Sequence, residues 1–336
     1  MSEVMIMDVW NVKEEEFPIK GSMEEKLKFL LNYAILAPSS HNTQPWKFSI
    51  KGNSIEVYAD LTRQLSEVDP ENRELYISVG CAIANLLIAA EHFGFGYKLE
   101  YHEKEDKVVI IEFSKLEERN FPDLFSEIKL RHTNRREYES RAVEKEKLQE
   151  LKACIDKDFR LDLITDCKIR SEIAKIIALA DEIQLSNKAF RKELASWLRH
   201  NWSKAGDGMP GYAFGIPSIM SLFGSFFIRT FDISKSQAKK DEELANKAPI
   251  IGILSSTEDN KFSWVKVGVT FEKVMLMATK LNLSIAFFNQ PIEVPELRKE
   301  LRTLLGIAEF PQLMFRIGYM KPTKHTPRRR LEEVIV

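Results

Sequence analysis

Cysteine is scarce in this sequence, with three residues among 336. Cys81, Cys154 and Cys167 lie far apart and follow no CxxC or metal-ligand spacing, so we predict no metal site. An odd, scattered set of this kind is typical of buried free thiols in a reducing compartment. The first half also offers no histidine cluster and no nucleophile beside a base. We therefore predict no catalytic side chain.

Net charge is also nearly absent, because 49 Lys and Arg residues face 50 Asp and Glu residues. A chain with a charge of −1 has no global field that would attract nucleic acid or an anionic membrane. The N-terminus carries early acids and no signal-type apolar core, so a cytoplasmic protein is expected. The apolar run 212–228 is interrupted by Gly215, Pro217 and Gly224 and is too short to span a membrane. A buried helix or a hydrophobic flap over a pocket fits it better.

What the sequence does contain is typical of a soluble globular protein: 44% apolar and 29% charged residues, with enough length for two domain-sized units. Ser22 and Glu25 form a capping box before an apolar face at helical spacing, which predicts a helix up to Pro38. Together with several strand-like runs, this predicts an α+β fold. Further helices are expected over 72–93, 144–155, 169–200, 264–281 and 294–305, and strands over 47–50, 55–59, 97–101, 108–113, 159–163, 248–255, 284–288 and 313–319.

A weak internal repeat relates the two halves. Gly80 is followed by an apolar helical stretch and then by Gly94, and Gly268 is followed by another and then by Asn282, with the same interval and a constant offset of 188 residues. Gly and Asn are the residues that most readily end a helix in the left-handed conformation, so the pattern predicts two copies of one fold. We place the first copy at 1–125 and the second at 126–336. A glycine- and aromatic-rich insertion around 200–245 is expected in the second copy, either as a lid or as a well-packed excursion without motion.

The loop from Ala37 to Trp46 concentrates polar groups between two prolines. Proline fixes φ, so the hydroxyls, carboxamides and imidazole of this loop are held in a nearly fixed frame. Such a frame suits a planar ligand with many hydrogen-bond acceptors. The alternative is a capped turn whose Trp46 fills the core.

This loop resembles the A-P-S-x-x-N-x-Q-P-W segment of the nitroreductase family of FMN-dependent oxidoreductases. Three further segments resemble motifs of that family. The run 131–136 is similar to R-x-S-x-R with threonine for serine, 291–294 is similar to P-I-E-G with valine for glycine, and 328–333 is similar to the closing basic motif without its proline. The resemblance implies FMN bound by Pro38, Ser39, Ser40, Asn42, Gln44, Arg131, Thr133, Arg135, Gln290, Pro291, Glu293, Val294, Arg328 and Arg330.

Each of these segments has a role implied by the family. Arg131, Thr133 and Arg135, with Arg328 or Arg330, would hold the phosphate, which guanidinium groups suit well. The hydroxyls and carboxamides of the Pro38 loop would bond the ribityl chain or the ring edge. The main-chain N–H groups of Glu293 and Val294 would lie near the flavin N5.

The distribution of the segments predicts a fused pseudo-dimer. In a nitroreductase dimer the two subunits supply the loop and the phosphate clamp, whereas here the loop lies in the first copy and the clamp in the second. The offset places a second P-I-E turn at residues 103–106, which do not match it, so one site is expected to be lost. This arrangement resembles the Acg-like, two-copy branch of the family.

The implied activity is hydride transfer from NAD(P)H through the flavin to a small oxidised or aromatic acceptor. A flavin-sequestering protein with a covered cofactor, or an α+β protein that binds no cofactor, would be the alternatives. A monomer that binds neither nucleic acid nor membrane is expected.

Overall fold

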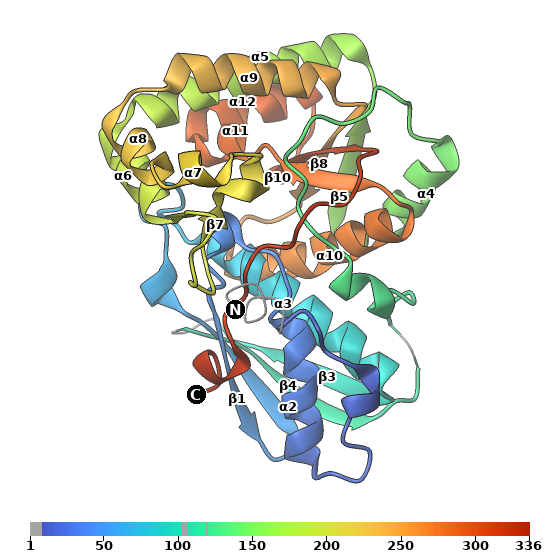
Figure 1. Ribbon diagram of the computed structural model, residues 1–336. Coiled ribbons are helices and arrows are strands. Elements are labelled where there is room, and N and C mark those ends of the chain that lie inside the picture. Colours follow the sequence, from blue (N-terminus) through green and yellow to red (C-terminus); the bar gives the residue numbers. More distant parts are fainter. Residues whose placement is uncertain (1–8, 103–105, 119) are drawn as a thin grey trace.

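The computed structural model describes residues 9–102, 106–118 and 120–336, and two halves are stacked in it (Figure 1). Each half contains a four-stranded antiparallel sheet, so the predicted α+β fold is confirmed. The first sheet has the strand order β1 (Trp46–Lys51), β2 (Ser54–Ala59), β4 (Lys107–Lys115) and β3 (Phe95–Tyr101). The second has the order β5 (Phe159–Ile164), β8 (Ile250–Ser256), β10 (Phe310–Gly318) and β9 (Ser284–Phe287).

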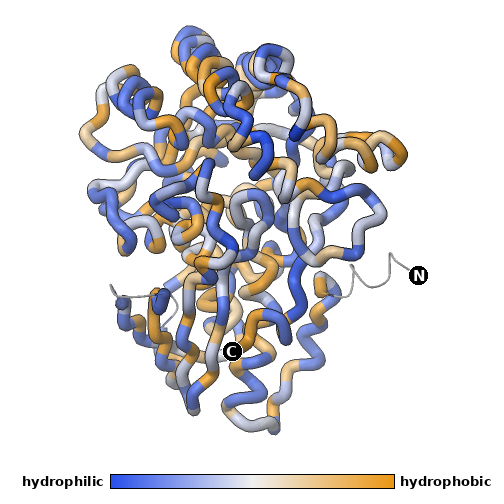
Figure 2. Tube along the Cα trace, turned by 90° about the vertical axis from the view of Figure 1, so that its left-hand side faces the viewer, coloured by the Kyte–Doolittle hydropathy of each residue, from blue (hydrophilic) through white to orange (hydrophobic). Residues whose placement is uncertain are grey.

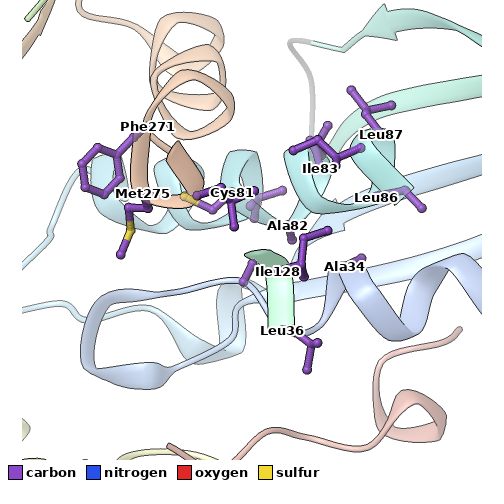
Figure 3. Packing of buried hydrophobic residues seen from close by; sticks show 14 of the residues in the cluster. Ala34, Leu36, Cys81, Ala82, Ile83, Leu86, Leu87, Ile128, Phe271 and Met275 are labelled. Carbon is purple, nitrogen blue, oxygen red and sulfur yellow. The ribbon is translucent and has the colours of Figure 1, made fainter. Parts of the chain in front are cut away.

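Two long apolar helices join the halves. α3 (Arg73–His92) is apolar and long enough to cross a membrane, but 89% of its most apolar window is buried inside the protein. It packs on α10 (Lys261–Lys280), and Figure 3 shows Cys81 of α3 beside Phe271 and Met275 of α10. The apolar character of α3 is therefore explained by its place in the core.

The two helices cross where both lack a side chain. A Cβ atom on Gly80 would lie 2.0 Å from the carbonyl oxygen of Val265, and a Cβ atom on Gly268 would lie 2.0 Å from that of Ile77. Only glycine permits this backbone approach. The offset of 188 residues relates Gly80 to Gly268 and Ile77 to Val265, so the two contacts are reciprocal, as expected of a local twofold axis through the crossing.

The strand orders of the two sheets are also equivalent, but their connections differ greatly. β1 and β2 are joined by the two-residue turn 52–53, whereas the corresponding strands β5 and β8 are joined by residues 165–249. The insertion is thus longer than the predicted 200–245. The insertion directly follows the strand β5.

The insertion contains five helices: α5 (Cys167–Ser186), α6 (Lys188–Ser196), α7 (Ser218–Ser221), α8 (Gly224–Thr230) and α9 (Ser234–Lys247). The predicted single helix 169–200 is wrong, because the chain breaks at Asn187, whose side chain caps α6. Cys167 begins α5 and is exposed, so the prediction of three buried thiols holds only for the other two. The charged helix α9 was not predicted, since its apolar face is narrow.

The insertion covers the second sheet. Ile251, Ile253 and Met314 pack against α5, α9, α11 (Gln290–Glu293) and α12 (Pro295–Leu305), while the opposite face of the sheet packs against α10. Among the described residues the first sheet has no such outer layer, and its strands alternate between hydrophilic and hydrophobic residues (Figure 2). Strands buried on both faces read as continuous apolar runs, and half-buried strands alternate.

Two further helices and the C-terminal segment complete the fold. α2 (Met23–Ala34) begins with the predicted capping box, and α4 (Lys145–Ala153) precedes the second sheet. The C-terminal segment runs from the second half to the first (Figure 1), where the N–H of Phe48 donates to the carbonyl of Val334 (2.8 Å) and the N–H of Val336 donates to that of Phe48 (2.9 Å). The last residues therefore extend the edge of the first sheet at β1.

Candidate functional site

A cavity of about 470 Å³ lies where the two halves and the insertion meet. The first half contributes residues 38–41 and one end of α3, and the second contributes residues 286–290, parts of β10, and α5 and α9. Phe214, Phe227 and Ile228 of the insertion close it with apolar side chains. A mostly apolar pocket with a few convergent polar groups has the character of a small-molecule site.

The Pro38 loop has an unusual backbone. His41, Asn42 and Gln44 all have positive φ, at 50°, 56° and 53°. Three left-handed non-glycine residues in four positions are costly and persist only when their surroundings hold them. The Ser39 hydroxyl accepts a hydrogen bond from the N–H of Gln44 (2.8 Å), and the Ser40 hydroxyl donates to Glu74 of α3.

The carboxamides of this loop are already occupied. Asn42 Nδ2 donates to the carbonyls of Gly208 (2.9 Å) and Pro327 (3.0 Å). Gln44 Nε2 donates to the carbonyl of Gly206 (2.8 Å), and its Oε1 accepts from the N–H of Arg329 (2.8 Å). These amides therefore fasten the loop to the insertion and the C-terminal segment.

The predicted loop contacts divide accordingly. Pro38, Ser39 and Ser40 line the cavity, Asn42 lines only a small adjoining recess, and Gln44 lines neither. The predicted flavin contact of Gln44 therefore does not fit the structure, since both ends of its amide are bonded to backbone. Trp46 is fully buried, so the interpretation of this residue as one that fills the core is confirmed.

The recess, of about 30 Å³, gathers three of the predicted arginines. Arg131 is buried, with Nε 3.4 Å from the carboxylate of Glu272, and it also donates to the carbonyl of Leu36 (3.2 Å). Arg328 stacks over Trp10 at 4.8 Å and donates to Asn42 Oδ1 (2.9 Å). Burial lowers the pKa of Arg328 to about 9. Arg131 thus has a core counter-ion, whereas Arg328 is bonded only to neutral acceptors among the described residues.

The two C-terminal arginines, Arg328 and Arg330, differ in their position relative to the cavity. Arg330 is exposed and lines neither the cavity nor the recess. Of the two arginines that the closing motif offered, only Arg328 reaches the site.

Arg135 lies at the junction of cavity and recess beside Thr133, and both residues line both spaces. Its guanidinium lies 5.0 Å from the ring centroid of Phe214 and 4.0 Å from the sulfur of Met209. Within the described ranges it forms no ion pair. Desolvation lowers the pKa of Arg135 to about 10.

Arg316 is a second cation of this kind, and the motifs did not identify it. It is 2% exposed, lines the cavity, and donates through Nη2 to the carbonyl of Arg135 (2.7 Å) between the rings of Tyr138 and Phe288. Its Nε has no hydrogen-bond partner among the residues described. A sequence signal did exist, since an arginine interrupts the apolar strand Leu313–Ile317. Buried cations without a counter-ion are costly, so Arg135 and Arg316 fit an anionic ligand.

The P-I-E segment forms a short helix, and this changes its predicted role. The N–H of Glu293 donates to the carbonyl of Asn289 (3.1 Å) inside α11, so in this structure it is not free for the predicted contact with flavin N5. Val294 packs with Leu297 instead of lining the cavity, and Pro291 is buried. From this segment, the side chains of Gln290 and Glu293 reach the cavity.

Four carboxyl groups also line the cavity. Only that of Glu293 belongs to a motif, and the motif implied no role for its side chain. Glu74 accepts from Asn289 Nδ2 (3.0 Å), and Glu293 accepts from Gln184 Nε2 (2.6 Å). Burial and the charge of Glu74 raise the pKa of Glu293 well above its ordinary value. The other two are Asp181 and Asp241. No group of three potential metal ligands occurs within the described residues.

Comparisons with known proteins agree with the motifs. The family described as "Putative TM nitroreductase" matches residues 12–70, which include the Pro38 loop. The chain is 25% identical over 324 residues to "Putative NAD(P)H nitroreductase Rv3131" of Mycobacterium tuberculosis, covering 93% of this chain and 91% of the relative. It is 24% identical to "Putative NAD(P)H nitroreductase acg" of the same organism, covering 92% and 94%.

One solved structure that the chain matches is the FMN and NADPH-dependent nitroreductase NfnB from sphigopyxis sp. strain HMH. It is 16% identical, with a TM-score of 0.42, and the match covers 63% of this chain and 97% of that one. From the relatives and the family match, the predicted relationship to the nitroreductases, and to Acg-like proteins among them, is confirmed.

Proposed function

We propose, from this relationship, that the chain is an FMN-dependent oxidoreductase that transfers a hydride from NAD(P)H to a small oxidised or aromatic acceptor. The observation that carries the proposal is Arg135, a desolvated guanidinium without an ion-pair partner within the described ranges, at the junction of an apolar cavity and an arginine-lined recess. A phosphate in the recess would supply the missing negative charge, and a planar ring would fill the apolar cavity.

The residues would divide the work as follows. Arg135, Thr133 and Arg328 would hold the phosphate, while Pro38, Ser39 and Ser40 would bound the cavity where the ribityl chain leaves the recess. Bound flavin supplies the hydride-transfer chemistry. The protein excludes water with its apolar walls and places cationic Arg316 beside the cavity, where it would stabilise developing negative charge.

Arg131 has a different role in this proposal from the one that the motif implies. Its guanidinium is engaged by Glu272 and by the carbonyl of Leu36, next to the Pro38 loop. We therefore assign it to positioning the loop and to the positive potential of the recess. Direct phosphate contact is assigned to Arg135 and Arg328.

The pseudo-dimer belongs to the same proposal. The equivalent strand orders and the reciprocal glycine contacts support a tandem duplication in which one chain supplies both sides of the site. The copy 1–125 alone would lack the clamp, and the copy 126–336 alone would lack the loop. Because one chain contains both copies, a monomer would be sufficient to form the site. The predicted loss of a second site rests on residues 103–106, of which 103–105 lie outside the described residues. A cytoplasmic location also remains a prediction.

The storage alternative is favoured by one observation, the apolar cover. Phe214, Ile216 and Phe227 line the cavity from the insertion with apolar side chains. A cover that never opens would hold the flavin and exclude the acceptor. Mixing the purified protein with NAD(P)H without oxygen separates the two functions: bleaching of the flavin absorption supports the enzyme, and unchanged absorption supports storage.

The clamp is tested by the variant Arg135→Gln, with Arg330→Gln as a matched control. Loss of a charge-assisted phosphate contact should weaken FMN binding at least tenfold, about 1.4 kcal/mol or more, whereas the exposed Arg330 should matter less than twofold. Titration of apoprotein with FMN, followed by flavin fluorescence, measures both. Equal affinities of wild type and Arg135→Gln would refute the phosphate assignment. Arg131→Ala is unsuitable, because it leaves Glu272 buried without its counter-ion.

A further inference from the structure

We infer that Asp181 and Asp241 form a proton-donating pair that protonates the acceptor as it is reduced. This role rests on the proposed oxidoreductase function and adds two catalytic side chains to it. None of the four motifs contains either residue.

The geometry brings the two carboxyl groups together at one wall of the cavity. Asp181 comes from α5 and is 3% exposed, while Asp241 comes from the adjacent α9 and is 8% exposed. A single amide nitrogen, Gln290 Nε2, lies 3.2 Å from Oδ1 of Asp181 and 3.3 Å from Oδ2 of Asp241. Gln237 Nε2 also donates to Oδ2 of Asp241 (3.0 Å). Two carboxyl groups so close together in a dry wall favour sharing one proton.

One oxygen of the pair is left for a ligand or a shared proton. Oδ2 of Asp181 accepts no hydrogen bond from any N–H or O–H donor among the described residues, and the facing group is Asp241. Gln290 Oε1 and Arg316 Nε are also without partners within the described ranges, and all three residues line the same cavity. Buried polar groups normally have a hydrogen-bond partner. A wall with an acceptor, an amide oxygen and a guanidinium N–H that lack one therefore suits a polar ligand group.

The charges around the pair decide its protonation. α9 adds Lys240 at the cavity wall, β10 adds the buried Arg316, and residue Arg135 lies beyond it. From α3 and α11, Glu74 and Glu293 add negative charge on another side of the cavity. Burial and the neighbouring Asp241 raise the pKa of Asp181 to about 8. The pKa of Asp241 is also raised, chiefly by burial. The pair therefore keeps a proton at neutral pH.

The chemistry requires such a proton. An acceptor that takes a hydride, originally from NAD(P)H, gains two electrons and one hydrogen at one atom, and negative charge develops at a neighbouring atom. The carboxyl O–H bond of the pair breaks, a bond forms between this proton and the charged acceptor atom, and the pair is left as carboxylates. Water then returns a proton to the pair after the product leaves. A positioned acid of this kind typically contributes 10²- to 10⁴-fold to rate.

The experiment separates the two half-reactions in flavin-loaded protein by stopped-flow absorption. Asp181→Asn, Asp241→Asn and the double variant are compared with wild type and with Glu243→Gln, an exposed acid on α9 as a control. NADPH serves as reductant and menadione as the acceptor. We expect the rate of flavin reduction to change less than twofold in every variant. The rate of reoxidation by menadione should fall at least tenfold in the Asp variants only.

The pH profile tests proton donation directly. Reoxidation of wild type should slow as the pH rises through the titration of the pair, and it should be slower in D2O. Both dependences should be lost in Asp181→Asn, and Asp181→Glu should restore part of the rate. The infrared difference spectrum between wild-type apoprotein and the double variant at pH 7 should contain a carbonyl band from a protonated carboxyl group of the pair, distinct from any band of Glu293 that both proteins share.

The outcomes distinguish the inference from the function on which it rests. Protein that binds flavin and reacts with NADPH, but whose reoxidation is unchanged in the double variant, refutes the proton-donating pair alone. Protein that binds no FMN refutes the proposed function and this inference together. Loss of the infrared band without loss of reoxidation rate assigns the pair a structural role and overturns the catalytic one.

Discussion

The two sheets have the same strand order but different surroundings. On the rung where β10 pairs with β9, Arg316 lies opposite Ala286, and on the rung 188 residues earlier in β3, Glu112 of β4 lies opposite Lys98. Arg316 is buried beside the cavity, whereas Glu112 is exposed to solvent. Equivalent positions in one shared frame therefore have opposite charge and opposite exposure.

The difference comes from what covers each sheet. Residues 165–249 supply α5 and α9 over the outer face of the second sheet, while the two-residue turn 52–53 supplies nothing over the first. Covering a face removes water from the side chains that remain there, and this perturbs their pKa values and leaves some unpaired. The shared frame positions the halves, and the added cover creates the site.

The shared frame should be the most sensitive to substitution. In Gly80→Ala the new Cβ would meet the backbone of Val265, so α3 and α10 must separate along the whole central contact. We expect a loss of about 3 kcal/mol or more in the free energy of unfolding. Gly224→Ala is the matched control, since a Cβ there meets nothing within 4 Å. Urea unfolding measures both, and equal stabilities would contradict the close crossing.

Stability should depend on pH through the second half. Because the folded pKa of Asp181 is raised to about 8 from an ordinary value of 3.8, the folded state binds the extra proton between these values. Stability is therefore fully present below pH 4 and is lost progressively as the pH rises to about 8. Asp181→Asn should remove this slope and be the more stable protein at pH 8. Thermal unfolding from pH 5 to 9 measures it, and parallel curves would contradict the raised pKa.

The next largest effect on stability and FMN binding is expected at Arg316, compared with its equivalent position Glu112 in the first sheet. Arg316→Met replaces a buried cation without an ion-pair partner in the described part of the chain, so the apoprotein should gain about 1 kcal/mol. The same change should weaken FMN binding at least tenfold, because a charge near the ring is lost. Glu112→Gln, on the equivalent rung, should change neither measurement. Calorimetry of apoprotein with a flavin titration tests this, and weakened binding in both variants would remove the distinction between the sheets.

The smallest effect is expected for a substitution at the start of α2, in the half of the protein that the insertion 165–249 does not belong to. Ser22→Ala removes the hydroxyl that accepts from the N–H of Glu25 at the start of α2 (3.2 Å). Loss of this cap should cost about 1 kcal/mol of stability and leave FMN affinity unchanged. Altered affinity in this variant would show that the first half influences the cavity beyond the Pro38 loop.

Local patterns predicted most of the elements, because each depends on neighbours in the chain. The capping box at Ser22, the apolar run of α3 and the alternation in the first sheet required no tertiary information. Asn187 was overlooked because a cap inside a long helical pattern looks like an ordinary polar residue. α9 was overlooked because burial of a few alanines against α5 leaves no clear period in the sequence.

Part of the site was predictable from motifs, and part was not. Serines of the Pro38 loop, Thr133, Arg135 and Arg328 do meet at one cavity and its recess. The loop motif did not predict that Gln44 would be hydrogen-bonded to Gly206 and Arg329. The P-I-E motif did not predict that the N–H of Glu293 would close a helical turn. The partners of Gln44 lie more than a hundred residues away and are set by packing, so the motif specifies the amide and leaves its partners open.

Residue identity and spacing were enough to indicate the kinship and to mark the glycines at the helix crossing. Folding determined which side chains lack counter-ions among the described residues, that Arg316, Asp181 and Asp241 share one wall, and that Arg330 lies outside it. The physical reason is that charge and proton affinity depend on solvent exclusion, and solvent is excluded by whatever the folded chain places above a residue.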